Sequence, residues 1–412
     1  MFYIVIDLDK FLTLKNENSF QFSSLNRNFA LSLNFVEDRL HLNNKNKKNA
    51  FLFCIVFDLH YLCTDKLQTE MKRIVTFGEI LLRWSKGGAQ RLKQGSDWTG
   101  KFGGSEANVA VSLAMLGNKV GYVSRVPQNE VGQACLNELR YYGIDTRDVV
   151  RGGDRLGTYY FEAAAGLRRS QVVYDRRGSS FYSCAPGMFP WKDIFSRTDI
   201  FHCSGITCAV SQSATDATFE AVKTAKDMGL RITCDINFRK NLWRYEGADA
   251  HKTLNALMQY SDYIFGDQDE WEVATGVKQV PMDHMMADTE LDMDAYRRYF
   301  DEMHRQFPNC KEMMLGLRNQ ITSTHHTLTA LMWYHGEIYQ AHIYDIYPIV
   351  DPVGVGDAFV AAYVHAAEKW KGDPQRGLDF AVAAAQLKNS VAGDFNLVTE
   401  DEILEQIHPV NR

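Results

Sequence analysis

The residues best suited to chemistry stand near the end of the chain, in the run Asp351-Pro-Val-Gly-Val-Gly-Asp357. An apolar, alanine-rich segment follows and predicts a helix. Glycines directly before a helix allow a tight turn whose N–H groups point outward, where the helix dipole adds to their field. The run therefore predicts an anion site. Asp357, beside that site, is expected to be ionised and able to accept a hydroxyl proton, although Asp is also a common helix cap.

A second run with glycines before a predicted helix is Phe102-Gly-Gly-Ser-Glu-Ala-Asn108. Ser105 is the expected N-cap of a helix over 105–117. Gly104 would let a ligand approach the backbone, and Asn108 offers both a donor and an acceptor. By itself, however, this run is also typical of an ordinary loop-to-helix junction.

Carboxylates cluster at 267–272, directly after the apolar run Asp262-Tyr-Ile-Phe-Gly266. Such a tract is usually a solvated face. At the carboxyl end of a strand it could also help to hold Mg²⁺ through water. No GxxxxGK[ST] sequence occurs, and no GxGxxG opens the first strand–helix unit, which argues against a P-loop or a Rossmann dinucleotide site.

Through the rest of the chain, short apolar runs alternate with segments that have the hydrophobic periodicity of a helix, which predicts an α/β fold. A mostly parallel sheet with crossover helices on both faces is expected, with ligands at the carboxyl ends of its strands. The predicted strands are 73–77, 119–124, 199–205, 231–237 and 262–266, and the helices between the early strands are 105–117 and 130–143.

Two stretches interrupt this rhythm, within about 82–102 and 157–184. Both alternate polar and aromatic residues without helix signals, which predicts strands that leave the main sheet as a small lid. Residues 276–292 contain Pro281, three methionines and several acidic residues, and they are predicted to form a surface insertion.

Composition restricts the class of protein and its compartment. With 45 Lys and Arg against 51 Asp and Glu, the formal charge of −6 argues against a surface for non-specific nucleic-acid binding. The eight cysteines are scattered without a CxxC pair, as expected for reduced, buried thiols in a cytoplasmic protein. No run of 18 apolar residues occurs, so no membrane-spanning helix is predicted.

The composition changes at Met71. Residues 1–70 contain no Gly, Pro or Trp, although the whole chain of 412 residues has 29 Gly and 9 Pro. Turns between packed elements need such residues. Residues 1–70 are therefore predicted to be a poorly ordered or non-native extension, and 71–412 the functional domain. The alternative is an extra structured module that docks a partner.

The two glycine motifs, in this order and at this separation, resemble those of the ribokinase-like (PfkB-type) sugar kinases, over essentially 71–412. The resemblance implies a three-layer sandwich, phosphoryl transfer from ATP with Mg²⁺, and a homodimer formed through the lid. In the family's late motif the second Asp is the catalytic base, which falls on Asp357. The amides of Gly354, Val355 and Gly356 would then bind the transferred phosphoryl group.

Other family positions follow from the same resemblance. The family's Mg²⁺-linked NxxE motif matches Glu270 but has Asp267 in place of Asn. Gly316 matches a strand end on the nucleotide side, where Arg318 follows. Asn389 falls in the region that covers the adenine.

Three segments resemble 2-keto-3-deoxygluconate kinases in particular. They are Asp235-Ile-Asn-Phe-Arg239 with the following residues through Trp243, Tyr174-Asp-Arg176, and Leu387-Lys-Asn-Ser-Val-Ala-Gly-Asp-Phe-Asn396, in which Asn389 replaces the family's His. The substrate carboxylate would need a positive fork, for which Arg176 and Arg239 are the candidates. Tyr159 and Tyr174 would supply hydroxyl groups and rings, and Asn237 is assigned to the nucleotide side.

Several alternatives remain open at this point. The C4 epimer 2-keto-3-deoxygalactonate differs by one hydroxyl orientation, and a kinase of the same fold could act on fructose, ribose or a nucleoside. A regulator that has lost catalysis is the alternative of another class, against which the intact glycine motifs argue. The need for a monovalent cation is also open.

Overall fold

The computed structural model describes residues 73–166, 168–282 and 284–407. The expectation of a poorly ordered or non-native segment over 1–70 lies outside these residues. Chain packing separates Met1–Met71 from Lys72–Arg412, and the following description concerns the second unit alone.

The larger sheet of this unit has the strand order β14-β13-β12-β11-β10-β9-β1-β4, with β15 paired to β13. Its strands are β1 (Arg73–Phe77), β4 (Lys119–Val123), β9 (Ile200–Ser204), β10 (Arg231–Asp235), β11 (Tyr263–Asp267), β12 (Glu312–Thr322), β13 (His325–Tyr334), β14 (Glu337–Gln340) and β15 (Tyr344–Ile346). From β4 to β12 every pairing is parallel, and β13 pairs antiparallel with each of its neighbours. The predicted mostly parallel sheet is confirmed.

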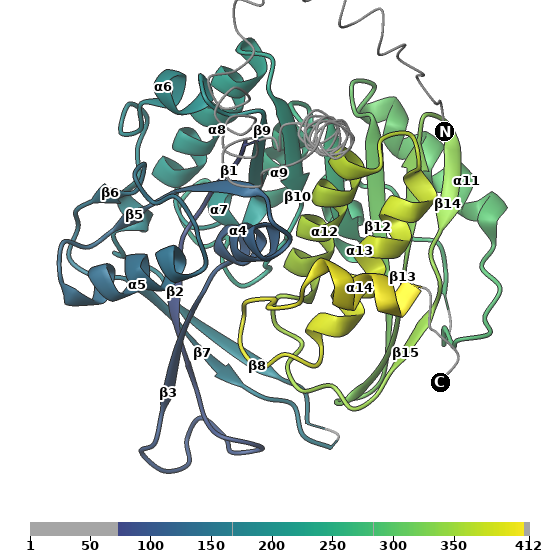
Figure 1. Cartoon of the computed structure of the whole chain (residues 1–412), viewed down its shortest axis with the longest axis horizontal. Helices are drawn as coiled ribbons and strands as arrows, with labels where there is room; N and C mark the ends of the chain where they lie inside the picture. Colours follow the sequence, from purple (N-terminus) through teal and green to yellow (C-terminus); the bar gives the residue numbers. More distant parts are fainter. Residues whose placement is uncertain (1–72, 167, 283, 408–412) are drawn as a thin grey trace, which may run out of the picture. The chain divides into compact units, whose positions relative to one another are not determined.

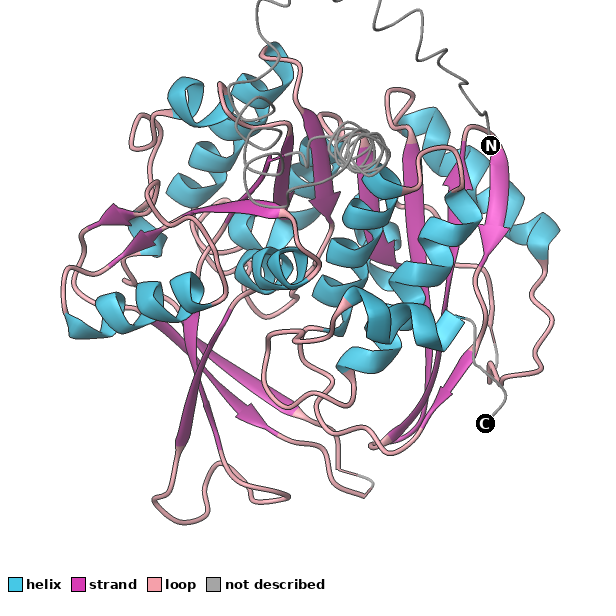
Figure 2. Ribbon diagram, in the orientation of Figure 1, coloured by secondary structure: helices cyan, strands magenta, loops and turns pink. Residues whose placement is uncertain are grey.

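Helices cover both faces of this sheet (Figures 1 and 2). Successive strand residues point to opposite faces, so Tyr263 packs in one apolar core and Ile264 in another. The first face carries α4 (Ser105–Met115), α5 (Glu130–Tyr141), α12 (Val355–Lys369), α13 (Pro374–Lys388) and α14 (Glu400–Ile407). The second carries α6 (Trp191–Phe195), α7 (Gly205–Cys208), α8 (Gln212–Asp227), α9 (Ala250–Met258), α10 (Gln268–Thr275) and α11 (Met293–Gln306).

A smaller sheet leaves the main one and is seen at the lower left of Figure 2. Its strand order is β3-β2-β7-β8. The strands are β2 (Leu81–Ser85), β3 (Thr99–Gly103), β7 (Gly157–Glu162) and β8 (Gln171–Asp175). Three short elements lie outside both sheets. They are the paired strands β5 (Arg125–Val126) and β6 (Val150–Arg151), and the 3₁₀ turn η1 (Phe181–Ser183). The predicted fold class, a three-layer sandwich with a small β-lid, is confirmed.

Two local predictions differ from the structure. The N-cap of α4 is Gly104, and Ser105 is the first residue of the helix. Gly104 has φ 156°, and a Cβ there would lie 2.2 Å from the carbonyl oxygen of Glu79, so only glycine fits. In the predicted surface insertion at 276–292, which forms neither helix nor strand in its described part, Met285 is fully buried in the core.

Candidate active site

A cleft of about 640 Å³ opens between the lid and the carboxyl ends of β10, β11 and β12. Binding sites of open α/β sheets lie at this edge. The cleft is lined by nearly all of the predicted site residues: Gly104, Asn108, Tyr159, Tyr174, Arg176, Asn237, Arg239, Glu270, Gly316, Arg318, Gly354, Val355, Gly356 and Asp357. The structure therefore brings together residues that are up to 253 positions apart, from Gly104 to Asp357.

The glycine turn before α12 has the shape of an anion site. Gly354 is the N-cap with φ 83°, and a Cβ there would lie 2.2 Å from the carbonyl oxygen of Asp394. The helix makes its first bond from Ala358 N–H to the Gly354 carbonyl, so the amides just before Ala358 have no partner within the helix. A Cβ on Gly356 would meet no atom within 4 Å, so the surface at this residue is open.

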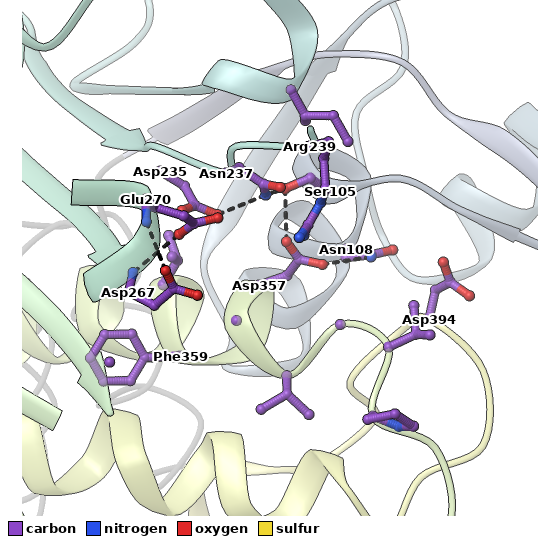
Figure 3. A pocket seen from close by; sticks show the side chains of 18 of the residues that line it. Ser105, Asn108, Asp235, Asn237, Arg239, Asp267, Glu270, Asp357, Phe359 and Asp394 are labelled. Carbon is purple, nitrogen blue, oxygen red and sulfur yellow. Dashed lines mark hydrogen bonds between the residues drawn. The ribbon is translucent and has the colours of Figure 1, made fainter. Parts of the chain in front are cut away.

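Asp357 sits in the first turn of α12 with both carboxylate oxygens hydrogen-bonded (Figure 3). The Ser105 hydroxyl donates to Oδ1 at 2.7 Å, and the Asn108 side-chain amide donates to Oδ2 at 2.7 Å. Asn237 donates in turn to the Ser105 hydroxyl and to Asp235, each at 2.8 Å. These contacts fix the carboxylate of Asp357 in one orientation at the wall of the cleft.

Burial raises the pKa of Asp357, and the hydrogen bonds from Asn108 and Ser105 and the charges of Arg239 and Lys388 oppose this rise. Burial and the charge of Asp357 together raise the pKa of Asp235 to about 7. The site thus holds two neighbouring carboxyl groups whose protonation states depend on each other.

Three of the four side chains predicted to bind the substrate carboxylate or to donate a hydroxyl differ in how far other residues already engage them. Arg239 is exposed within the cleft, and no salt bridge joins it to another described residue. Arg176 is buried and pairs through Nε with Glu79 at 2.5 Å, while its buried Nη1 has no hydrogen-bond partner among the described residues. The hydroxyl of Tyr159 donates to Asp394, so its proton is not free to be donated to a ligand.

On the predicted nucleotide side, Gly316 and the exposed Arg318 line the cleft at the end of the parallel part of β12. Asn389 does not line the cleft. It is the C-cap of α13, it is buried, and its side-chain amide donates to the carbonyl oxygen of Ala385 at 3.0 Å. The structure thus gives Asn389 a helix-capping position outside the lining of the cleft.

Glu270 and Asp267 form a capping box at the start of α10, in which each carboxylate accepts from the other's backbone N–H. Each carboxylate keeps one oxygen free of these bonds. Burial and the charges of Asp267 and Asp235 raise the pKa of Glu270 well above its ordinary value. Oxygen ligands suit Mg²⁺, but no group of three or more acidic, His or Cys residues in the described part could hold a metal by itself. These residues fit a metal ion held through water and substrate phosphates.

A buried ion pair between the lid and the glycine turn was not predicted. Arg83 on β2 pairs with Asp351 at 2.9 Å and with Asp394 at 3.0 Å. Asp351 also accepts from the backbone N–H groups of Val353 and Gly393. Arg83 stands 311 positions from Asp394, and the only hint in the sequence is an Arg between apolar residues in Leu81-Leu-Arg-Trp-Ser85.

Comparison with known proteins agrees with this geometry. The model of the pfkB family carbohydrate kinases matches residues 71–309, more than half of the chain. The chain belongs to this family. It is a carbohydrate kinase, an enzyme class that binds a sugar and ATP. In its described part, no helix is long and apolar enough to cross a membrane.

Individual relatives are similar along most of their length. A 2-dehydro-3-deoxygalactonokinase of Haloferax volcanii is 29% identical, over 80% of this chain and 95% of the relative. The crystal structure of a 2-dehydro-3-deoxygluconokinase from Thermotoga maritima superposes with a TM-score of 0.75 at 32% identity, covering 82% of this chain and 99% of that one. A putative ribokinase II from E. coli, solved with ATP and Mg²⁺, shares the fold with a TM-score of 0.65 at 19% identity, over 82% and 100% of the two chains.

Proposed function

We propose that the enzyme phosphorylates the terminal (6-) hydroxyl of 2-keto-3-deoxygluconate, also called 2-dehydro-3-deoxygluconate, with ATP as the donor. The observation that carries the substrate class is Arg239, a guanidinium in the same cleft as Asp357 and the glycine turn that forms no salt bridge with any residue the structure describes. A sugar acid offers Arg239 a carboxylate for a charge-assisted pair, whereas a neutral sugar offers none.

In the proposed reaction, Asp357 accepts the proton of the terminal hydroxyl. The hydroxyl oxygen forms a bond to the γ-phosphorus as the bond to the ADP oxygen breaks, in line with it. The amides of the glycine turn stabilise the charge on the transferred group, and ADP leaves with the bridging oxygen. Mg²⁺, when bound near Glu270, would supply further neutralisation of the phosphates.

The other side chains position the two substrates. Ser105 and Asn108 hold the Asp357 carboxylate, and Arg176, already paired with Glu79, offers its remaining Nη1 to the sugar acid. The lid would exclude water from the transfer and so limit ATP hydrolysis. We further propose that two copies associate through their lids, because Val173 on β8 and Trp98 beside β3 expose large apolar side chains on the smaller sheet.

The two relatives act on sugar acids that differ at C4, by their names a galactonate and a gluconate derivative. The decisive experiment is ADP release by the purified full-length chain with 2-keto-3-deoxygluconate, its galacto epimer, fructose and ribose in parallel. Turnover confined to the two keto-deoxy acids would support the role of Arg239, and their ratio of kcat/KM would identify the preferred epimer. Comparable turnover of a neutral sugar would exclude the proposed substrate class.

A further inference from the structure

Lys388, the last residue of α13, lies inside the protein directly behind the glycine turn. Its side chain has no exposed surface. Its Nζ donates to the carbonyl oxygens of Val391 at 2.9 Å and of Asp351 at 3.4 Å. A Cβ on Gly354 would lie 3.3 Å from Cε of Lys388. The lysine side chain thus touches the N-cap of α12 and bonds to a loop on either side of it.

The charges of Asp351 and Asp394 favour the Lys388 ammonium most, and that of Asp357 follows, but none of these carboxylates forms an ion pair with it. Arg83 already forms ion pairs with Asp351 and Asp394, whereas no salt bridge within the described residues includes Lys388. Its hydrogen-bond partners are backbone carbonyls instead. Burying an ammonium in this way costs free energy unless surrounding charges favour it. The same ammonium also favours the ionised form of Asp357, after the hydrogen bonds from Asn108 and Ser105 and the charge of Arg239.

We propose that Lys388 is a positioning residue of the phosphoryl-transfer site, which holds the glycine turn from behind and adds its charge to the field at that turn and at Asp357. The proposal rests on the proposed function, because the charge of Asp357 limits turnover only if this group is the base. The ammonium lies on the protein side of amides that would bind a phosphoryl group, so its field adds to theirs. Burial lowers the pKa of Lys388 to about 8, so the charge is present at neutral pH and is lost above it.

The charged groups that act on Asp357 come from several elements. Arg239, which follows β10, favours its ionised form together with Lys388, and Asp235 at the end of β10 opposes it. Around Lys388 itself stand Asp351, Asp394, Arg83 and Asp357. Removing the ammonium therefore leaves Arg239, which acts on Asp357 more strongly than Lys388 does, to favour the ionised form of Asp357.

The test compares Lys388→Met and Lys388→Arg with Lys369→Met, which removes an exposed lysine from the far end of α12. For each variant, kcat and the KM for ATP are measured between about pH 5.5 and pH 9.5 with a saturating acceptor. In Lys388→Met we expect the acid limb of kcat to move up by about one pH unit, and kcat at neutral pH to fall by roughly tenfold or more. The matched control should keep the wild-type profile.

Lys388→Arg provides a second readout, because a guanidinium keeps its charge where a lysine of lowered pKa loses it. We expect the alkaline limb of its kcat profile to lie at higher pH than that of the wild type. This readout tests the role of Lys388 even if the Met variant does not fold. A folded Met variant whose kcat falls equally at every pH, or an Arg variant with an unmoved alkaline limb, would overturn the proposal. If a neutral sugar is the true acceptor, the proposed substrate is wrong. The acid and alkaline limbs of kcat, measured with that sugar, still test the role of Lys388.

Discussion

Replacing Asp357 by Asn tests the proposed chemistry with the smallest possible change of shape. The side chain stays isosteric, and its oxygen can still accept from Asn108. Its new NH₂ group would face the Ser105 hydroxyl, which has two lone pairs and can accept from it while still accepting from Asn237. The local network therefore survives with one hydroxyl rotated, and the group that is lost is the proton acceptor.

The expected loss follows from that role. A positioned general base contributes about 10² to 10⁴ in rate. A fall in kcat of about 10³, or about 4 kcal/mol in activation free energy, is the central expectation. Stability should change little, because Asn also removes the free-energy cost of burying the ionised Asp357, the same burial that raises its pKa. We expect a Tm within about 4 °C of the wild type, which corresponds to roughly one altered hydrogen bond.

The assay is ADP release at saturating ATP and sugar acid, with ATP affinity measured by calorimetry on the same preparation. Asp301→Asn, at an exposed position of α11, is the matched control and should keep wild-type kcat. A folded Asp357→Asn variant that binds ATP normally and keeps more than about a tenth of the wild-type kcat would refute Asp357 as the base, because a base contributes at least about a hundredfold.

Three further variants test the surrounding groups. Arg239→Ala should raise the KM for the sugar acid by about tenfold to a hundredfold with a smaller change in kcat, since a charge-assisted pair contributes about 1.5 to 3 kcal/mol; an unchanged KM would remove Arg239 from the carboxylate site. Arg83→Met leaves Asp351 and Asp394 buried without their cation and should cost about 3 to 5 kcal/mol in urea unfolding, so an unchanged midpoint would contradict the buried ion pair. Burial raises the pKa of Glu106 to about 7, so its contribution to stability is full below pH 4.5 and is lost as the pH rises through 7. Glu106→Gln should therefore gain stability relative to the wild type between about pH 5 and pH 8, by at most about 3 kcal/mol, and a constant difference in Tm across that range would contradict this pKa.

Local patterns in the sequence were enough to predict β1, β4, β9, β10 and β11, because each is a short, largely buried apolar run, but not β12 to β15 of the same sheet. They were also enough to predict the glycine turn, since Gly354, Gly356 and Asp357 are neighbours in the chain. The order of the motifs along the chain indicated the family, and the family resemblance then predicted the other residues of the cleft. The alternating lid segments were predicted for the same reason, because period-two patterns need no knowledge of distant partners.

What escaped prediction depends on contacts between distant residues or on the direction of a side chain. The pairing of Arg83 with Asp394 spans the whole domain and leaves no local pattern. Asn389 and Lys388 are adjacent in sequence, but successive residues at a helix end point about 100° apart. Lys388 consequently reaches the glycine turn, whereas Asn389 turns back to cap its own helix. The N-cap at Gly104 depends on the approach of the Glu79 backbone, which no spacing reveals.

The ion pairs of Arg83 also limit how such kinases can be recombined. Because β2 of the lid is tied to Asp351 of the glycine turn and to Asp394, the lid is not an independent module that could be exchanged for that of a relative with another sugar preference. A chimaera with a β2 strand from a relative that lacks an arginine at position 83 would leave the buried carboxylates of Asp351 and Asp394 without this cation, beside the glycine turn. Transplanting substrate preference within this fold therefore means moving the lid together with both partner loops.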